Sequence, residues 1–316
     1  MLKLPELRIG NLVAKIPIIQ GGMAIRVSMA PLAAAVASEG GIGIIAGTGL
    51  SVEELKTEIR KARELTKGII GVNVMFAVRE FADLVKAAIE EKIDLIVSGA
   101  GFSRDMFTWG KESGIPVVPI VSTAKLAHLS EKLGAAAVIV EGKEAGGHLG
   151  TLQSMREIVP QVKKAVKIPV IGAGGVIDGQ DLAEVMKLGA DGVQMGTRFA
   201  ASDECSASMA FKEHLVNAED KDIVLVESPV GLPGRGVQNQ FTDRLMAGED
   251  LRPSSCDGCL KHCKRNFCIM RALCYAQQGD LYNGLVFSGE RVRKIREILP
   301  VRKIFENLLR EVDKIS

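Results

Sequence analysis

Short apolar segments alternate regularly with helical stretches from Ile16 to Phe199. The apolar segments are rich in β-branched residues, which is typical of buried parallel strands. Eight strands are expected, at Ile16–Gln20, Gly43–Ala46, Ile69–Val74, Asp94–Ser98, Val117–Val121, Ala137–Glu141, Val170–Gly172 and Gly192–Met195. The alternation predicts an α/β fold, a (β/α)8 TIM barrel, and favours it over an open doubly wound sheet.

The stretches between these strands carry helix signals. Ser51–Leu65 begins with a serine N-cap and has Glu53 and Glu54 in its first turn and basic residues later. Charges in this order interact favourably with the helix dipole. Similar helices are expected at Arg79–Glu91, Thr123–Lys132, Ser154–Val166 and Asp178–Leu188. A chain of 316 residues has room for one barrel of about 250 residues and an appendage.

The pattern changes after Phe199. We expect the last barrel helix at Ser202–Ala218, a short extra strand at Asp222–Val226, a loop rich in proline and glycine at Ser228–Gly236, and a charged helix at Val301–Lys314. No further β/α alternation follows Gln238. The sequence therefore predicts a barrel over residues 1–236 and a helical C-terminal segment over residues 237–316, which is expected to cover the barrel mouth.

Composition excludes several classes of protein. Aromatic residues make up only 4% of the chain, and Lys+Arg 40 nearly balance Asp+Glu 38. A nucleic-acid partner is therefore not expected, because such proteins need a basic excess and stacking side chains. The chain has no apolar run of membrane-spanning length and no apolar signal core near Met1. We expect a cytoplasmic, soluble protein without a membrane partner.

Two glycine-rich segments follow the last two expected strands. Gly174 and Gly175 come after Val170–Gly172, and Gly196 and Thr197 come after Gly192–Met195. Phosphate sites in TIM barrels are usually built from these two loops, where glycines let backbone amides approach an anion. The alternative is that the glycines only make tight turns. Because both expected loops are glycine-rich, the sequence favours a phosphate site.

Three polar side chains stand at other strand ends. His148 follows Gly146 and Gly147, and an imidazole there can donate or accept a proton near neutral pH. Glu141 ends a buried strand and needs a hydrogen-bond partner, such as a ribityl hydroxyl. Asn73 could read the edge of a ring or cap the strand. The competing interpretation of His148 is a surface histidine in a flexible loop.

Five of the six cysteines lie close together near the C-terminus. Four of them, Cys256, Cys259, Cys263 and Cys268, are spaced closely enough to reach one ion. Thiolates suit zinc and iron–sulfur clusters, although the spacing matches neither the ferredoxin nor the zinc-ribbon pattern. The alternative is a set of free thiols in a segment rich in lysine and arginine.

The chain resembles the nitronate monooxygenase (2-nitropropane dioxygenase) family, which includes flavin-dependent enoyl-acyl carrier protein reductase II. The matching stretches are I-P-I-I-Q-G-G-M, G-V-N-V-M, E-A-G-G-H-L-G, I-G-A-G-G and Q-M-G-T-R-F. The resemblance implies a TIM barrel that binds FMN non-covalently, with His148 as the catalytic residue. It implies cofactor contacts from Gly22, Met23, Asn73, Glu141, Gly146, Gly147, Gly174, Gly175, Gln194, Met195, Gly196 and Thr197.

Two activities of the family are compatible with these motifs. In the reductase, NAD(P)H reduces FMN, which then passes a hydride to an enoyl thioester carried by acyl carrier protein. In the monooxygenase, a nitronate reduces FMN and dioxygen reacts. The Q-G-G-M and G-V-N-V-M stretches resemble the reductase more closely, whereas the cysteine-rich segment departs from it. A flavin and metal electron-transfer protein is a third alternative. The sequence leaves a monomer and a homodimer both open.

Overall fold

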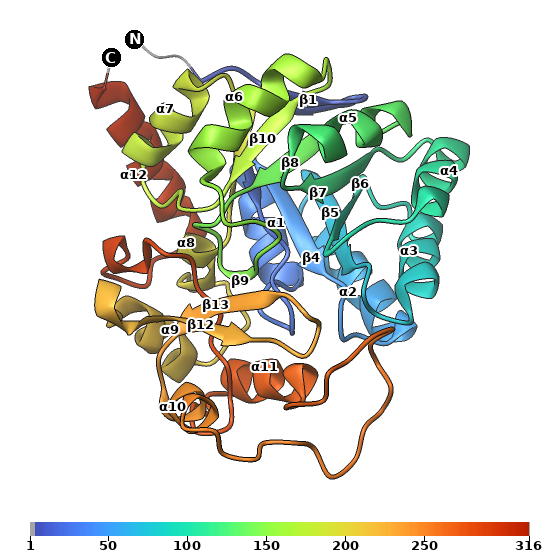
Figure 1. The fold of residues 1–316 in the computed structure, drawn as a ribbon. Coiled ribbons are helices and arrows are strands. Elements are labelled where there is room, and N and C mark those ends of the chain that lie inside the picture. Colours follow the sequence, from blue (N-terminus) through green and yellow to red (C-terminus); the bar gives the residue numbers. More distant parts are fainter. Residues whose placement is uncertain (1–3, 316) are drawn as a thin grey trace.

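Eight parallel strands close into a barrel in the computed structural model, which describes residues 4–315. The strands are β3 (Ile18–Gln20), β4 (Ile42–Ala46), β5 (Ile69–Met75), β6 (Leu95–Gly99), β7 (Val117–Val121), β8 (Val138–Glu141), β10 (Val170–Ala173) and β11 (Gly192–Met195). The ring closes where β11 pairs with β3, with Val193 opposite Ile18. The predicted TIM barrel is therefore confirmed (Figure 1).

Aliphatic side chains fill the barrel interior. Ile19, Ile44 and Ile139 are fully buried there, in one cluster with Leu7 and Ile9 of an N-terminal hairpin. The hairpin consists of the antiparallel strands β1 (Leu7–Ile9) and β2 (Leu12–Ala14). It closes the N-terminal end of the barrel, so the carboxyl ends of the strands form the functional face.

Helices cover the outside of the barrel. They are α1 (Ala30–Ser38), α2 (Val52–Leu65), α3 (Phe81–Glu90), α4 (Arg104–Ser113), α5 (Ala124–Lys132), α6 (Met155–Ala165) and α7 (Gly179–Lys187). Ser51 and Glu54 form a capping box at the start of α2, as its sequence indicates. The alanine-rich α1 lies directly on β4, where a Cβ at Gly43 would be 1.9 Å from the Ala33 carbonyl oxygen. Small residues at both positions permit this close approach.

The eighth outer helix comes from the C-terminal part of the chain. Helix α12 (Val301–Lys314) packs against α7 and α1 (Figure 1), and the Gly179 N–H donates to the Glu311 carboxylate at 2.7 Å. The expectation of a last barrel helix at Ser202–Ala218 is wrong. Helix α8 (Thr197–Ala200) ends before that range, and only α9 (Met209–Val216) is helical within it. Helix α9 packs against α11 (Ile269–Gln278).

A small antiparallel sheet lies over the mouth of the barrel. It is formed by β9 (Gly147–His148), β12 (Ile223–Glu227) and β13 (Pro233–Val237) in the order β12-β13-β9. The expectation of a loop throughout Ser228–Gly236 is thus wrong, because β13 pairs with strands on both sides despite its proline and glycines. The extra strand expected at Asp222–Val226 is present as β12.

The remaining short helices are α10 (Gln240–Met246) and the 3-10 turns η1 (Asp220–Asp222) and η2 (Val292–Lys294). Asn239 caps the start of α10, and its side chain accepts from the Thr242 N–H at 3.0 Å. Among residues 4–315, no helix combines the length and the apolar composition that a lipid bilayer crossing requires.

Candidate active site

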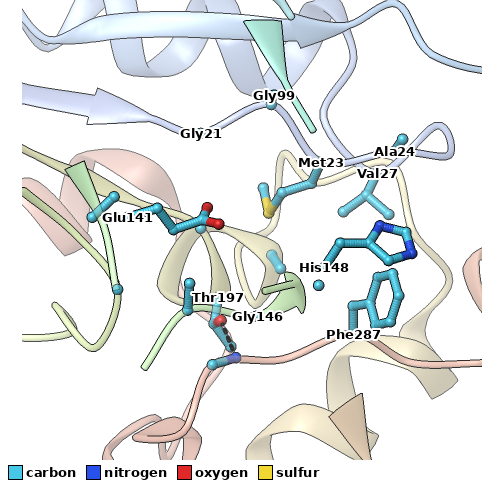
Figure 2. A pocket seen from close by; sticks show the side chains of 18 of the residues that line it. Gly21, Met23, Ala24, Val27, Gly99, Glu141, Gly146, His148, Thr197 and Phe287 are labelled. Carbon is cyan, nitrogen blue, oxygen red and sulfur yellow. Dashed lines mark hydrogen bonds between the residues drawn. The ribbon is translucent and has the colours of Figure 1, made fainter. Parts of the chain in front are cut away.

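A cavity of about 250 Å³ opens at the carboxyl ends of the barrel strands. Residues at the carboxyl ends of all eight barrel strands and from the C-terminal segment line it together (Figure 2). All but one of the predicted site residues of the barrel are among them: Gly22, Met23, Asn73, Glu141, Gly146, Gly147, His148, Gly174, Gly175, Gln194, Gly196 and Thr197. The exception is Met195, which is 1% exposed and belongs to the apolar core.

One side of the cavity has amide oxygens without partners. Asn73 Oδ1 and Gln194 Oε1 are buried and accept no hydrogen bond. Asn73 Nδ2 donates weakly to the Gly22 carbonyl at 3.4 Å. A Cβ at Gly22 would lie 2.5 Å from the Asn73 Cβ, and one at Gly21 would lie 3.1 Å from the Gln194 Cδ. The two glycines leave space beside the unpaired amide oxygens. A flat ring with N–H donors at its edge would fit this space and supply the missing hydrogen bonds.

Glu141 ends β8 and directs its carboxyl group into the cavity (Figure 2). Protein encloses the group on its other sides, and this burial raises the pKa of Glu141 to about 8. Near pH 7 most of the group is therefore protonated. A neutral carboxyl group can both donate and accept, which suits a ligand hydroxyl.

His148 lies in β9, which pairs with β13 so that His148 is opposite Gly234. The ring packs edge-on against Phe287 with centroids 5.1 Å apart, and its Nε2 is 2.7 Å from the Ser228 Oγ. Burial lowers the pKa of His148 to about 4. The imidazole is therefore neutral at pH 7, where the sequence led us to expect a titrating ring. His148 lies in a paired strand, so the alternative interpretation of a surface histidine in a flexible loop is wrong.

The predicted phosphate cradle lies at the ends of β10 and β11. Gly174 and Gly175 have φ angles of 110° and 67°, a left-handed region that favours glycine. The Thr197 hydroxyl accepts from the Gly289 N–H at 2.9 Å, which joins the cradle to the C-terminal segment (Figure 2). A cradle of this kind, left open by glycines, fits the single terminal phosphate of FMN.

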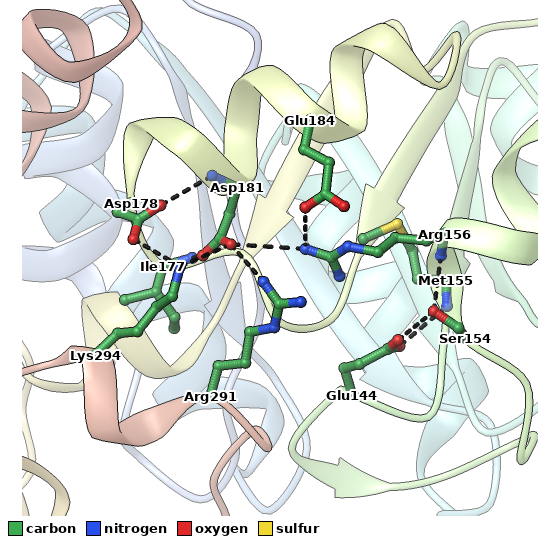
Figure 3. A network of polar contacts seen from close by, with 10 residues as sticks. All are labelled: Glu144, Ser154, Met155, Arg156, Ile177, Asp178, Asp181, Glu184, Arg291 and Lys294. Atoms are coloured by element: carbon green, nitrogen blue, oxygen red, sulfur yellow. Dashed lines mark hydrogen bonds and ion pairs between the residues drawn. The ribbon is translucent and has the colours of Figure 1, made fainter. Parts of the chain in front are cut away.

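The C-terminal segment adds residues that the sequence did not single out. A Cβ at Gly175 would lie 3.5 Å from the Arg291 Nε, so this guanidinium stands beside the cradle. Arg291 pairs with Asp181 at 2.5 Å, and Lys294 pairs with the same carboxylate at 2.9 Å (Figure 3). The Asp181 side chain is only 3% exposed. The sequence around Arg291 has no recognisable motif, so only the folded structure identifies this residue as part of the site.

The predicted metal ligands lie in an irregular segment before α11. Cys256 and Cys263 are exposed, and Cys259 and Cys268 are partly buried. Burial raises the pKa of Cys259, and the neighbouring thiols raise it further. Within residues 4–315, no group of three or more metal-binding side chains has the arrangement of a metal site. The structure does not assemble the four thiols into a ligand set, and metal binding stays a prediction.

These features together describe a TIM barrel with a candidate cofactor pocket at its mouth. A profile of the family described as nitronate monooxygenase matches residues 6–94 and 78–311, and the chain belongs to this family of flavin enzymes. It is 29% identical to a "Probable nitronate monooxygenase" of Staphylococcus saprophyticus subsp. saprophyticus, over 99% of both chains.

Two further similarities are to proteins with other activities. The chain is 33% identical to (3aS,4S,5R,7aS)-5-hydroxy-7a-methyl-1-oxo-octahydro-1H-indene-4-carboxyl-CoA dehydrogenase of Mycobacterium tuberculosis, over 75% of this chain and 67% of the relative. FabK from Thermotoga maritima, an enoyl-acyl carrier protein reductase II, superposes with a TM-score of 0.83. Its sequence identity is 36%, over 95% of this chain and 93% of FabK.

Proposed function

We propose that this flavin oxidoreductase is an NAD(P)H-dependent enoyl-acyl carrier protein reductase. The observation that carries the proposal is the apolar wall of the cavity formed by α11 and the segment after it. Ile269, Met270, Leu273, Leu285 and Phe287 line the cavity there. Such a wall suits the hydrocarbon part of an acyl thioester better than a small nitronate. The 36% identity to FabK supports the same choice.

The chain's own residues would divide the work. Gly174, Gly175 and Thr197 would hold the phosphate of FMN, and Asn73 and Gln194 would bind its ring. Bound FMN would supply the redox chemistry between NAD(P)H and the enoyl thioester. His148 would face the substrate from the apolar side. Acyl carrier protein would be the partner that delivers the thioester, and the protein would act in the cytoplasm.

Anaerobic mixing tests the proposal directly. The FMN-loaded protein is mixed with NADH or NADPH while the flavin absorbance is followed, and crotonyl-coenzyme A is then added. Rapid bleaching followed by reoxidation with the thioester is expected. Bleaching by a nitronate but by neither nicotinamide would instead establish the alternative, a nitronate monooxygenase, which the similarity to the staphylococcal protein also supports.

A further inference from the structure

The His148 ring is held by a contact that the cofactor site does not explain. Its Nε2 lies 2.7 Å from the Oγ of Ser228, the residue that follows β12. Ser228 is 0% exposed. The pair therefore lies inside the protein and links the site strand β9 to the neighbouring hairpin of β12 and β13.

The direction of this hydrogen bond follows from the surroundings of Ser228. A buried hydroxyl proton needs an acceptor, and the only one that the described residues offer it is His148 Nε2. The hydroxyl therefore donates to Nε2. Because a neutral imidazole has one proton, that proton must be on Nδ1.

The other ring nitrogen is open to the cavity. No described residue hydrogen-bonds His148 Nδ1, and this atom is absent from the fully covered polar atoms that lack a partner. His148 itself lines the cavity. An Nδ1–H group is thus available to a substrate atom.

Packing restricts rotation of the ring as well. Phe287 meets the imidazole at an interplanar angle of 77° (Figure 2). Gly234 makes room for Phe287, because a Cβ at Gly234 would lie 2.9 Å from the phenyl Cε1. A flipped imidazole would present a carbon to the Ser228 hydroxyl and leave the hydroxyl proton unpaired.

We propose that Ser228 is a positioning residue that fixes His148 in the Nδ1–H form, so that a neutral imidazole donates a hydrogen bond to a substrate oxygen. This proposal rests on the proposed function for the identity of that oxygen, the thioester carbonyl. The oxygen gains negative charge when hydride adds to the β-carbon, and a fixed donor stabilises that charge until a proton from water adds to the α-carbon and completes the reduction. The proton stays on Nδ1. His148 therefore orients the substrate and stabilises the charge on its oxygen without changing its own charge.

The charged groups around His148 are compatible with a neutral ring. Glu141, Glu144 and Arg291 line the same cavity, but none of them bonds the imidazole. On the flanking strands, Glu227 pairs with Lys264 and Arg235 pairs with Glu290. Burial alone accounts for the low pKa of His148. We therefore expect the Nδ1–H form from pH 6 to pH 8.

Nitrogen-15 NMR of the FMN-loaded protein, labelled at histidine, tests the tautomer without relying on turnover. The chain has 4 histidines, and His148→Gln identifies the signals of His148. The wild type should show a protonated Nδ1 and a bare Nε2 across this pH range. Ser228→Ala should give a mixture of both tautomers, and Ser228→Thr, which keeps the hydroxyl, should restore one. A wild-type ring protonated at Nε2 would overturn the proposal.

Turnover provides the second readout. Ser228→Ala should reduce crotonyl-coenzyme A turnover by about tenfold, the worth of one well-placed hydrogen bond, while bleaching by NAD(P)H stays unchanged. Ser130→Ala is the matched control, since Ser130 is also 0% exposed but its hydroxyl donates to the Leu126 carbonyl within α5. A Ser228→Ala enzyme with wild-type tautomer and turnover would refute the positioning role. A wild type without thioester turnover would refute the proposed function alone.

Discussion

At the scale of single residues, the cavity has two ionisable groups that burial keeps uncharged. Glu141 and His148 come from adjacent parts of the chain, and each loses hydration without gaining an oppositely charged partner. Their pKa values consequently move in opposite directions, up for the acid and down for the base. Both side chains are neutral near pH 7, so they offer directed hydrogen bonds rather than charge.

Replacing His148 by alanine should leave FMN binding intact and lower thioester turnover by roughly 10²–10³-fold. This is the usual cost of removing one donor from a developing oxyanion. Steady-state kinetics and flavin fluorescence provide the two measurements. His262→Ala is the control, because His262 is exposed and lies in the cysteine-rich segment. Equal activities of the two variants would remove His148 from catalysis.

Glu141 should make the apoprotein less stable as the pH rises. Its pKa is about 8 in the folded state against an ordinary value of 4.5, so the folded protein retains a proton that the unfolded chain releases. The stability linked to this proton is fully present below about pH 4.5 and is lost as the pH rises through about 8. Melting temperatures of the apoprotein between pH 5 and pH 9 should fall more steeply for the wild type than for Glu141→Gln. Parallel curves would contradict the shifted pKa.

At the scale of elements, two turns and one distant segment form the cradle proposed for the FMN phosphate. The turns after β10 and β11 supply backbone amides, while residues 288–294 lie across them and contribute Arg291. The ion pairs of Arg291 and Lys294 with Asp181 fasten this segment to α7 (Figure 3). Cofactor affinity should therefore depend on both the turns and the segment.

Gly175→Val should weaken FMN binding by about tenfold or more, since a side chain there blocks hydrogen bonds to a charged group. Gly134→Val is the matched control. Gly134 also has a positive φ, 98°, but a Cβ there would meet nothing within 4 Å. Both variants should lose comparable thermal stability in the apo form, and only the first should lose FMN affinity. Equal FMN dissociation constants would show that Gly175 serves the turn alone.

Arg291→Ala should raise the FMN dissociation constant by about tenfold and reduce its dependence on salt, because a cation beside the phosphate is lost. Lys294→Ala tests whether the ion pairs alone matter. Lys294 pairs with Asp178 at 2.8 Å and with Asp181 at 2.9 Å, yet it does not line the cavity. Fluorescence titration with FMN at two ionic strengths distinguishes the two roles. Equal effects of both variants would mean that Arg291 only holds the C-terminal segment against α7 and does not contact the phosphate.

At the scale of the whole molecule, α12 completes the ring of outer helices between α7 and α1. Leu308 of α12 is 2% exposed, so Leu308→Ala should cost about 2–5 kcal/mol in the free energy of unfolding. Leu225→Ala is the control, since Leu225 is 51% exposed and should change stability by less than about 0.5 kcal/mol. Denaturant titration measures both. A small effect at Leu308 would mean that the barrel is stable without this helix.

The sequence predicted those parts of the molecule that local patterns determine. Strand–helix alternation identified the barrel, and glycines at strand ends located Gly174, Gly175 and Thr197 correctly at the cavity. The roles of Arg291 and Ser228 could not be predicted, because each depends on a contact across a large separation in the chain. The β-pairing of Pro233–Val237 and the docking of α12 were missed for the same reason.

The order of synthesis gives the position of α12 a further consequence. A ribosome completes all eight barrel strands before it makes residues 288–314, which supply Arg291 and the eighth helix. A nascent chain that stops after β11 therefore exposes the apolar surface of α1 and α7 that Ile304 and Leu308 later cover. Cofactor capture should follow release of the chain, and prematurely terminated products should be recognised by chaperones or proteases as unfinished.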